Sequence, residues 1–166
     1  MKTVLDTSVL VNCSNGAVLS IVFKLSTRTF VIPPAVATEF EAGDIAALQE
    51  AGKAGRVTIL NDADVPGALY LQLLRDWGLG EGETECIAFA SHAGGAFASD
   101  DRLARRRAAE LMGAAKVSGT LGLLKEAVAE QLITKDDAFA AYRQMRDAGG
   151  FLPEISIDFF DCEKRR

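Results

Sequence analysis

The feature that most constrains the fold is the alternation of short apolar runs with longer helical patterns. The expected strands are Thr3–Leu5, Thr29–Ile32, Val57–Leu60, Ala96–Ser99 and a very short Lys116–Val117. The expected helices are Val9–Leu25 with a break near Asn15–Gly16, Ala35–Glu41, Ile45–Ala51, Pro66–Trp77, Gly82–Ala93, Asp101–Met112, Leu121–Glu130, and one from an N-cap at Thr134 to Arg146. This alternation predicts an α/β fold with a mostly parallel sheet covered by helices on both faces.

The bulk composition is ordinary for a globular protein. The chain has 166 residues, 49% hydrophobic and 25% charged, which suits one domain with one core. No apolar run approaches the roughly 20 residues of a membrane helix, and the N-terminus enters a strand without a secretory signal. We therefore expect a protein with no membrane association.

Cysteine and histidine usage narrows the chemistry. Cys13, Cys86 and Cys162 are far apart and form no metal-binding or disulfide pattern, so a reducing cytoplasm is the expected location. The single histidine, His92, sits in an apolar helical pattern and is expected to be a surface or packed residue. A zinc site of the His/Cys kind and a Ser-His-Asp triad are both disfavoured.

Acidic residues follow two of the expected strands and begin two of the expected helices. Asp6 ends the first strand, Asp100 and Asp101 end the fourth, Glu39 lies early in the helix after the second, and Glu85 lies near the start of the helix from Gly82. Parallel strands bring these positions to one edge of the sheet, where α/β proteins place their active sites. Converging carboxylates repel unless they bind protons or a cation, so a Mg²⁺ or Mn²⁺ site is expected.

Each acid also has a simpler interpretation. Asp6 could cap the following helix, and one residue of the pair Asp100–Asp101 is expected to do so. Glu39 could be a solvated helix residue, while Glu85 could offset the helix dipole together with Glu81 and Glu83. The joint arrangement favours the functional interpretation.

Basic and hydroxyl side chains near these acids suggest a phosphate-containing substrate. Arg102, Arg105 and Arg106 share one side of a helix and could dock a phosphodiester backbone, or form a solvated basic face. Ser118 and Thr120 could hold a phosphate or a metal-bound water, or cap the next helix. The net charge of −5 argues against broad adhesion to nucleic acid but allows a nucleic-acid substrate.

Four segments in order resemble the motifs of PIN domains. They are LDTSVLVN, PPAVATEF with its acid at Glu39, GLGEGETECIAFA with its acid at Glu85, and FASDDRLARRRAAELMG followed by VSGTLGLLKEAV. The last resembles a bacterial and archaeal subfamily related to toxin ribonucleases. The resemblance runs from about Lys2 to Ile133, which sets residues 1–133 as the nuclease domain and 134–166 as a helical extension packed on or beside it.

The resemblance implies a three-layer α/β/α sandwich and metal-dependent RNA cleavage. The implied metal-binding acids are Asp6, Glu39, Glu85 and Asp101, with Asp100 the alternative to Asp101. We favour Asp101 because the serine or threonine of the family usually lies two residues before the acid, as Ser99 does here. Ser8 matches the polar position that follows the first acid.

The leading hypothesis is therefore an endoribonuclease, the toxin of a toxin–antitoxin pair, with RNA as substrate, a small antitoxin as partner and a homodimeric state. A PIN domain that binds RNA or a partner with little or no catalysis is the first alternative. A small-substrate phosphohydrolase with Asp6 as nucleophile is the second, and it is disfavoured because Ser8 stands where such enzymes usually carry a second aspartate.

Overall fold

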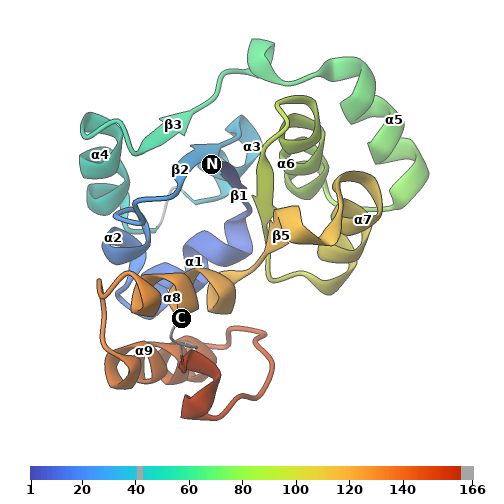
Figure 1. The fold of residues 1–166 in the computed structure, drawn as a ribbon. Coiled ribbons are helices and arrows are strands. Elements are labelled where there is room, and N and C mark those ends of the chain that lie inside the picture. Colours follow the sequence, from blue (N-terminus) through green and yellow to red (C-terminus); the bar gives the residue numbers. More distant parts are fainter. Residues whose placement is uncertain (41–42, 162–166) are drawn as a thin grey trace.

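The computed structural model describes residues 1–40 and 43–161. Its sheet is parallel throughout and has the order β3-β2-β1-β4-β5 (Figure 1). The strands are β1 (Lys2–Leu5), β2 (Thr29–Ile32), β3 (Val57–Ile59), β4 (Ala96–Ala98) and β5 (Val117–Ser118). The predicted three-layer α/β/α fold is confirmed.

The helices lie close to their predicted positions. They are α1 (Thr7–Asn15), α2 (Leu19–Val22), α3 (Pro34–Glu39), α4 (Ile45–Lys53), α5 (Gly67–Trp77), α6 (Glu81–His92), α7 (Arg102–Met112), α8 (Thr120–Ala129) and α9 (Lys135–Asp147). Prediction erred mainly at the ends. Helix α3 begins at Pro34, whose fixed φ suits a first turn. Lys116 belongs to a 3₁₀ turn instead of β5.

Parts of the sequence interpretation lie outside the described residues. They are the predicted helical position Glu41, the cysteine Cys162 and the end of the predicted extension, residues 163–166. Across the described ranges, no helix is long and apolar enough to span a membrane.

The topology creates a switch point between β1 and β4. From β1 the chain builds outward through β2 and β3, whereas from β4 it builds the other way to β5. Right-handed crossovers then place α1, α2 and α4 on one face of the sheet and α6 and α7 on the other (Figure 1). A crevice forms outside the carboxyl ends of the strands at such a point. Asp6 and the pair Asp100–Asp101 follow the two strands that flank it.

The core is apolar on both sides of the sheet, as a parallel sheet requires. Leu5, Phe30, Ile32 and Phe97 are no more than 1% exposed. Helix α9 packs against α1 and α8, and its buried residues belong to the same hydrophobic cluster as the strands. The assignment of residues 134–166 to a separate extension stays a prediction.

The end of α1 holds a non-glycine residue in a left-handed conformation. Ala17 has φ 53°, and the Val18 N–H donates to the Cys13 carbonyl at 2.9 Å, the pattern of a Schellman cap. The neighbouring Gly16 does not serve as the left-handed residue. A Cβ on Gly16 would lie 2.5 Å from the Met145 methyl carbon, so this glycine permits the close approach of α9.

We expect Ala17→Gly to raise the free energy of unfolding by about 0.5–1 kcal/mol, because glycine adopts this φ without the steric cost of a Cβ. Urea unfolding measures the change. Ala140→Gly is the matched control: Ala140 is exposed inside α9, where the same substitution should lower stability by about 1 kcal/mol. Equal destabilisation by both substitutions would contradict the prediction.

Candidate active site

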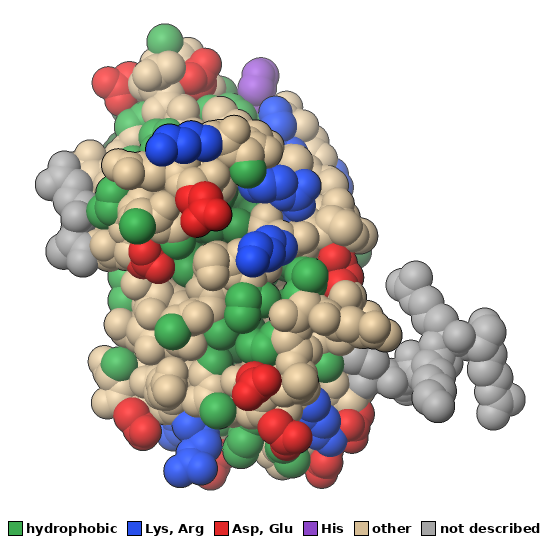
Figure 2. Space-filling model, turned by 90° about the vertical axis from the view of Figure 1, so that its left-hand side faces the viewer, with side chains coloured by type: hydrophobic (Ala, Val, Ile, Leu, Met, Phe, Trp, Pro, Cys, Tyr) green, Lys and Arg blue, Asp and Glu red, His purple; other side chains and the backbone are tan. Residues whose placement is uncertain are grey.

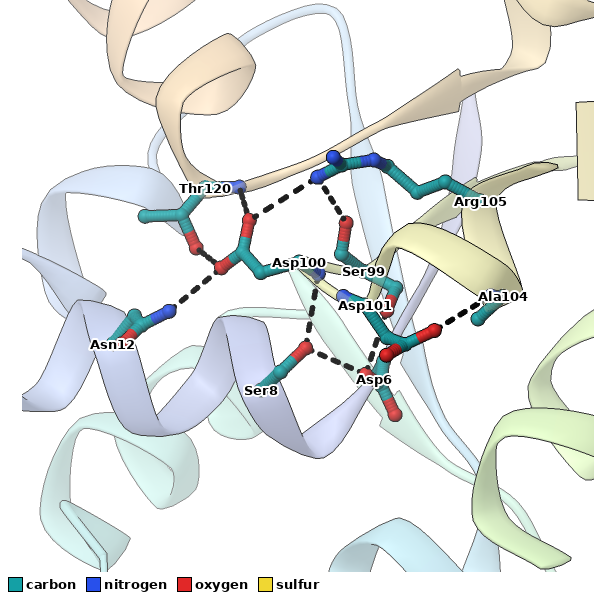
Figure 3. A network of polar contacts seen from close by, with 9 residues as sticks. All are labelled: Asp6, Ser8, Asn12, Ser99, Asp100, Asp101, Ala104, Arg105 and Thr120. Atoms are coloured by element: carbon teal, nitrogen blue, oxygen red, sulfur yellow. Dashed lines mark hydrogen bonds and ion pairs between the residues drawn. The ribbon is translucent and has the colours of Figure 1, made fainter. Parts of the chain in front are cut away.

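Asp6 is the centre of the candidate site. It follows β1 and is only 5% exposed. The hydroxyl groups of Ser8 and Ser99 donate to the same oxygen, Oδ2, at 2.6 and 2.8 Å (Figure 3). Asp6 occupies the N-cap position of α1, but its side chain makes no capping hydrogen bond. The simple capping interpretation therefore does not account for this residue.

The two serine hydroxyls are themselves fixed by consecutive backbone groups. The Asp100 N–H donates to Ser8 Oγ and the Asp101 N–H donates to Ser99 Oγ, both at 3.0 Å. A hydroxyl has one proton to donate. Once each oxygen accepts from the backbone, that proton points to Asp6. The end of β4 thus sets the orientation of the Asp6 carboxylate.

Asp100 is enclosed by a second set of contacts. Its side chain is 6% exposed and accepts from Asn12 Nδ2 at 2.7 Å and from the Thr120 N–H at 2.9 Å. The Thr120 hydroxyl also donates to it, and Arg105 Nη1 lies 3.8 Å from Oδ1. Through these contacts, the Asp100 carboxylate links α1, α7 and α8 at the end of β4 (Figure 3).

Asp101 is placed differently. Its residue is exposed, and Oδ1 accepts from the Ala104 N–H at 2.7 Å, which caps α7. In Figure 3 its side chain turns toward α7, whereas that of Asp100 turns toward Thr120 and Asn12. The structure therefore buries Asp100 in protein contacts and leaves Asp101 at the surface of the crevice.

Glu83 and Glu85 lie on different sides of α6. The Glu85 carboxylate accepts from the Ala35 N–H at 2.9 Å, at the start of α3. Burial raises the pKa of Glu85, the Ala35 N–H lowers it, and the negative charges of Asp62, Glu81 and Glu39 raise it further. Its predicted place in the metal site stays a prediction, but its carboxylate is directed to α3.

Glu83 faces the crevice instead. Burial raises the pKa of Glu83, and the negative charges of Asp6, Asp101 and Glu39 raise it further. Its carboxylate also accepts from the Gly80 N–H at 3.1 Å. Sequence reasoning treated this residue only as helix-dipole compensation and missed its position.

A signal in the sequence could have separated Glu83 from Glu85. Glu83 precedes Ile87 and Ala90 by four and seven positions, whereas Glu85 precedes Ala88 and Phe89 by three and four, so the two acids belong to different faces of a helix that is buried on most sides. Glu85 is about 200° away around a helix of 3.6 residues per turn. Helix phase therefore separates the two acids.

Glu39 is the remaining acid predicted for the site, and it comes from α3. It is exposed at the end of α3, and the Thr7 hydroxyl donates to its carboxylate. A Cβ on Gly82 would lie 3.3 Å from Glu39 Oε1, so the missing side chain lets α3 and the first turn of α6 approach each other. Glu39 is therefore close to Thr7 of α1 and Gly82 of α6.

The oxygen atoms of these side chains are suitable ligands for a hard divalent cation. All of them are carboxylate or hydroxyl oxygens, the ligands that Mg²⁺ and Mn²⁺ prefer. Within residues 1–40 and 43–161, no three Asp, Glu, His or Cys side chains converge closely enough to hold one ion directly. Mg²⁺ usually keeps several waters and takes one or two carboxylates, so the residues fit a hydrated ion.

The predicted substrate contacts have mixed positions. Arg102 and Arg106 are exposed on α7, and Arg105 is half-buried with Nη1 3.2 Å from the Ser99 carbonyl. Thr120 is fully buried against Asp100. The Ser118 hydroxyl oxygen is buried and has no hydrogen-bond partner in the described part of the chain. Of this set, the arginines are the residues that reach the surface.

We expect Asp6→Asn to stabilise the protein at neutral pH. Burial raises the pKa of Asp6, partly opposed by the Ser8 and Ser99 hydroxyls. The folded state therefore binds the proton more tightly than the unfolded state, so stability falls as pH rises from the ordinary value of 3.8 through the raised pKa. Asparagine removes this penalty and still offers an acceptor to the serines.

Urea unfolding in a chelator between pH 4 and 8 tests this prediction. The advantage of Asp6→Asn should be largest at the high end and shrink as the pH falls. Asp147→Asn, at the exposed end of α9, controls for the loss of one negative charge. A variant that is destabilised by the same amount at every pH would contradict the assignment.

We expect Gly119→Ala to lower the free energy of unfolding by about 1–3 kcal/mol through overpacking. A Cβ there would lie 2.6 Å from Asp100 Oδ1 and 2.9 Å from the Ser99 carbonyl oxygen. Thermal or urea unfolding measures the loss. In Gly122→Ala the Cβ meets Ser118 Cβ at an ordinary 3.5 Å, so this control inside α8 should gain up to about 1 kcal/mol. Similar effects at both positions would refute the close approach.

Comparison with known protein families agrees with this geometry. The family described as PIN domain matches residues 2–158, a range that includes α9. Neither a comparison with curated proteins nor one with solved structures gave a match. The resemblance seen in the four sequence motifs is confirmed over nearly the whole chain, and the protein belongs to the PIN domain family.

Proposed function

We propose that this protein is a metal-dependent endoribonuclease that cleaves phosphodiester bonds in RNA at the crevice between β1 and β4. PIN domains are typically nucleases and generally use divalent metal ions, which supports the class of activity. The observation that carries the proposal is the Asp6 carboxylate, buried at the switch point, fixed by two hydroxyls and faced by further acids.

The acids of the crevice would hold a hydrated ion, one or two of them directly and the others through its waters. We assign this role to Asp6, Glu39, Glu83 and Asp101, replacing the predicted Glu85 by Glu83 because Glu83 is the acid of α6 that faces Asp6 and Asp101. When bound, a divalent ion supplies an activated water and neutralises charge on the leaving oxygen. Ser8 and Ser99 keep the second Asp6 oxygen occupied, so the other oxygen is the one available for the ion.

Asp100 and Thr120 have a positioning role in this proposal. The Asp100 carboxylate fixes the backbone at the end of β4 through Asn12 and the start of α8. Its N–H then holds Ser8, and Ser8 holds Asp6. Thr120 is buried, so we propose that it supports Asp100 instead of touching RNA.

Helix α7 is the proposed docking element for the RNA backbone. Arg102 is exposed in its first turn, directly after Asp101, and Arg106 is exposed one turn later. Arginines near an acidic centre attract the phosphate groups that flank the cut. The face over α2, α4 and the α8–α9 connection instead carries interspersed positive and negative side chains (Figure 2), which does not favour a backbone track there.

The proposal extends to a biological context. We propose that the enzyme acts in the cytoplasm as the homodimeric toxin of a toxin–antitoxin pair, with a small protein as antitoxin. The support is the resemblance of its motifs to toxin ribonucleases and an apolar surface on α5, where Leu71 is 63% exposed. Co-purification with a small neighbouring gene product is the direct test of the pairing.

A binding-only PIN domain is the alternative, and it is favoured because no three acids of the described residues converge closely enough to hold one ion directly. RNA that binds tightly but is never cut would support this alternative. The structure disfavours the phosphohydrolase hypothesis, because Asp6 is 5% exposed and its Oδ2 accepts hydrogen bonds from the Ser8 and Ser99 hydroxyls. A covalent nucleophile needs open access to its substrate.

We expect cleavage of single-stranded RNA that requires Mn²⁺ or Mg²⁺ and that is lost in Asp6→Asn. Glu83→Gln should reduce the rate at least about 100-fold, whereas Glu85→Gln should cost less than about tenfold. The reason is that the charges of Asp6, Asp101 and Glu39 all raise the pKa of Glu83, whereas of these three acids only Glu39 acts on Glu85. Initial rates with a labelled oligonucleotide measure both effects.

Unfolding curves of the variants serve as the control for folding. Full activity in Asp6→Asn would end the nuclease proposal at this site. A larger loss in Glu85→Gln than in Glu83→Gln would return the metal-binding role to the residue predicted from sequence.

A further inference from the structure

A small pocket opens beside Glu39. It has a volume of about 250 Å³ and lies between α1 and the end of α3. Its lining residues are Val11, Ser14, Asn15, Glu39, Phe40 and Gly43. Because Glu39 belongs to both the pocket and the acidic crevice, the two sites are adjacent.

The helix α1 supplies one wall. Val11, Ser14 and Asn15 follow Thr7 by four, seven and eight residues, so all four share one face of the helix. Thr7 contacts Glu39, which anchors the start of this face at the crevice. Val11 is 41% exposed and offers an apolar surface.

The opposite wall is preformed by close packing. Phe40 is 2% exposed, and a Cβ on Gly43 would lie 2.2 Å from its ring. Only a glycine at position 43 leaves the ring in this place. The Phe40 ring therefore backs the pocket from within the core, and Val11 supplies its exposed apolar side.

Two polar side chains of the pocket, Ser14 and Asn15, make no hydrogen bond within the described structure. In the described structure, neither the Ser14 hydroxyl nor the Asn15 amide has a hydrogen-bond partner from a side chain or the backbone. Asn15 can donate twice and accept at its carbonyl oxygen. These groups are open to a ligand with its own donors and acceptors.

We propose that this pocket binds the base of the nucleotide next to the scissile phosphate and gives the enzyme its sequence preference. This inference rests on the proposed ribonuclease function. Among the described residues, the lining of the pocket includes no basic side chain and carries the Glu39 carboxylate, so a phosphate or an acidic peptide is repelled. A neutral planar base with polar edges fits both the apolar walls and the amide.

The size of the pocket supports a single base. Its volume lies below the roughly 300–1,000 Å³ of pockets that enclose a whole drug-sized ligand. An asparagine amide pairs with adenine through one donor and one acceptor. We therefore expect adenine to be preferred at this position, with Asn15 as the residue that reads it.

Cleavage of matched RNA oligonucleotides tests the inference. The set carries each of the four bases in turn on either side of one cleavage site. The wild-type protein should cut one position with adenine about tenfold faster than with the other bases. Asn15→Ala and Val11→Ala should reduce that preference at least threefold, with a smaller effect on the slowest substrate.

Gln72→Ala, an exposed polar residue of α5, is the control and should keep the preference. Unchanged preference in Asn15→Ala, or an equal loss on all four substrates, would overturn the inference while leaving the nuclease proposal intact. Absence of any cleavage by the wild-type protein would instead overturn the nuclease proposal.

Measurements of RNA binding test the inference independently of cleavage. Fluorescence anisotropy with the same RNAs in a chelator should show tighter binding of the adenine-containing strand, and Asn15→Ala should remove the difference. Equal affinity of the wild-type protein for all strands would overturn the inference, and a preference that survives Asn15→Ala would do the same.

Discussion

The site depends on two serine hydroxyls that hold one oxygen of a buried carboxylate. The parallel pairing of β1 with β4 brings Leu5 opposite Ala98, and the Asp6 N–H then donates to the Ala98 carbonyl at 3.0 Å. This register carries Ser99 to Asp6 across the switch point. A shift of one residue would turn these side chains to opposite faces of the sheet, so strand register and active-site geometry are a single constraint.

The surrounding structure compensates for the charge held there. A buried carboxylate costs free energy unless it accepts hydrogen bonds, and the raised pKa of Asp6 shows that its two hydroxyl contacts offset burial only in part. Asp100, at the end of the neighbouring strand β4, is met by amide, hydroxyl, backbone and guanidinium donors. The Asp100 carboxylate is thus stabilised by protein groups, whereas the Asp6 carboxylate would be stabilised further by a nearby positive charge.

Local pattern was sufficient for most of the fold. The strand Thr29–Ile32 and the N-cap at Thr134 could be predicted because apolar runs and capping chemistry act over a few residues. Glu83 was missed because acids at a helix start are usually dipole compensation, and only their different positions around α6 separate it from Glu85. The roles of Asp100 and Asp101 could not be assigned, since adjacent residues differ only in which neighbours they meet.

The sequence by itself determined the layered α/β fold and the acids that follow its strands, because hydrophobic periodicity and strand ends are written along the chain. Tertiary structure alone decided which carboxylates share a crevice and where a pocket opens beside it. Those outcomes depend on close approaches between distant segments, such as Gly82 against Glu39, Gly119 against Asp100 and Gly43 against Phe40. Such contacts are set by packing in three dimensions, and no periodic pattern of residues in the sequence indicates them.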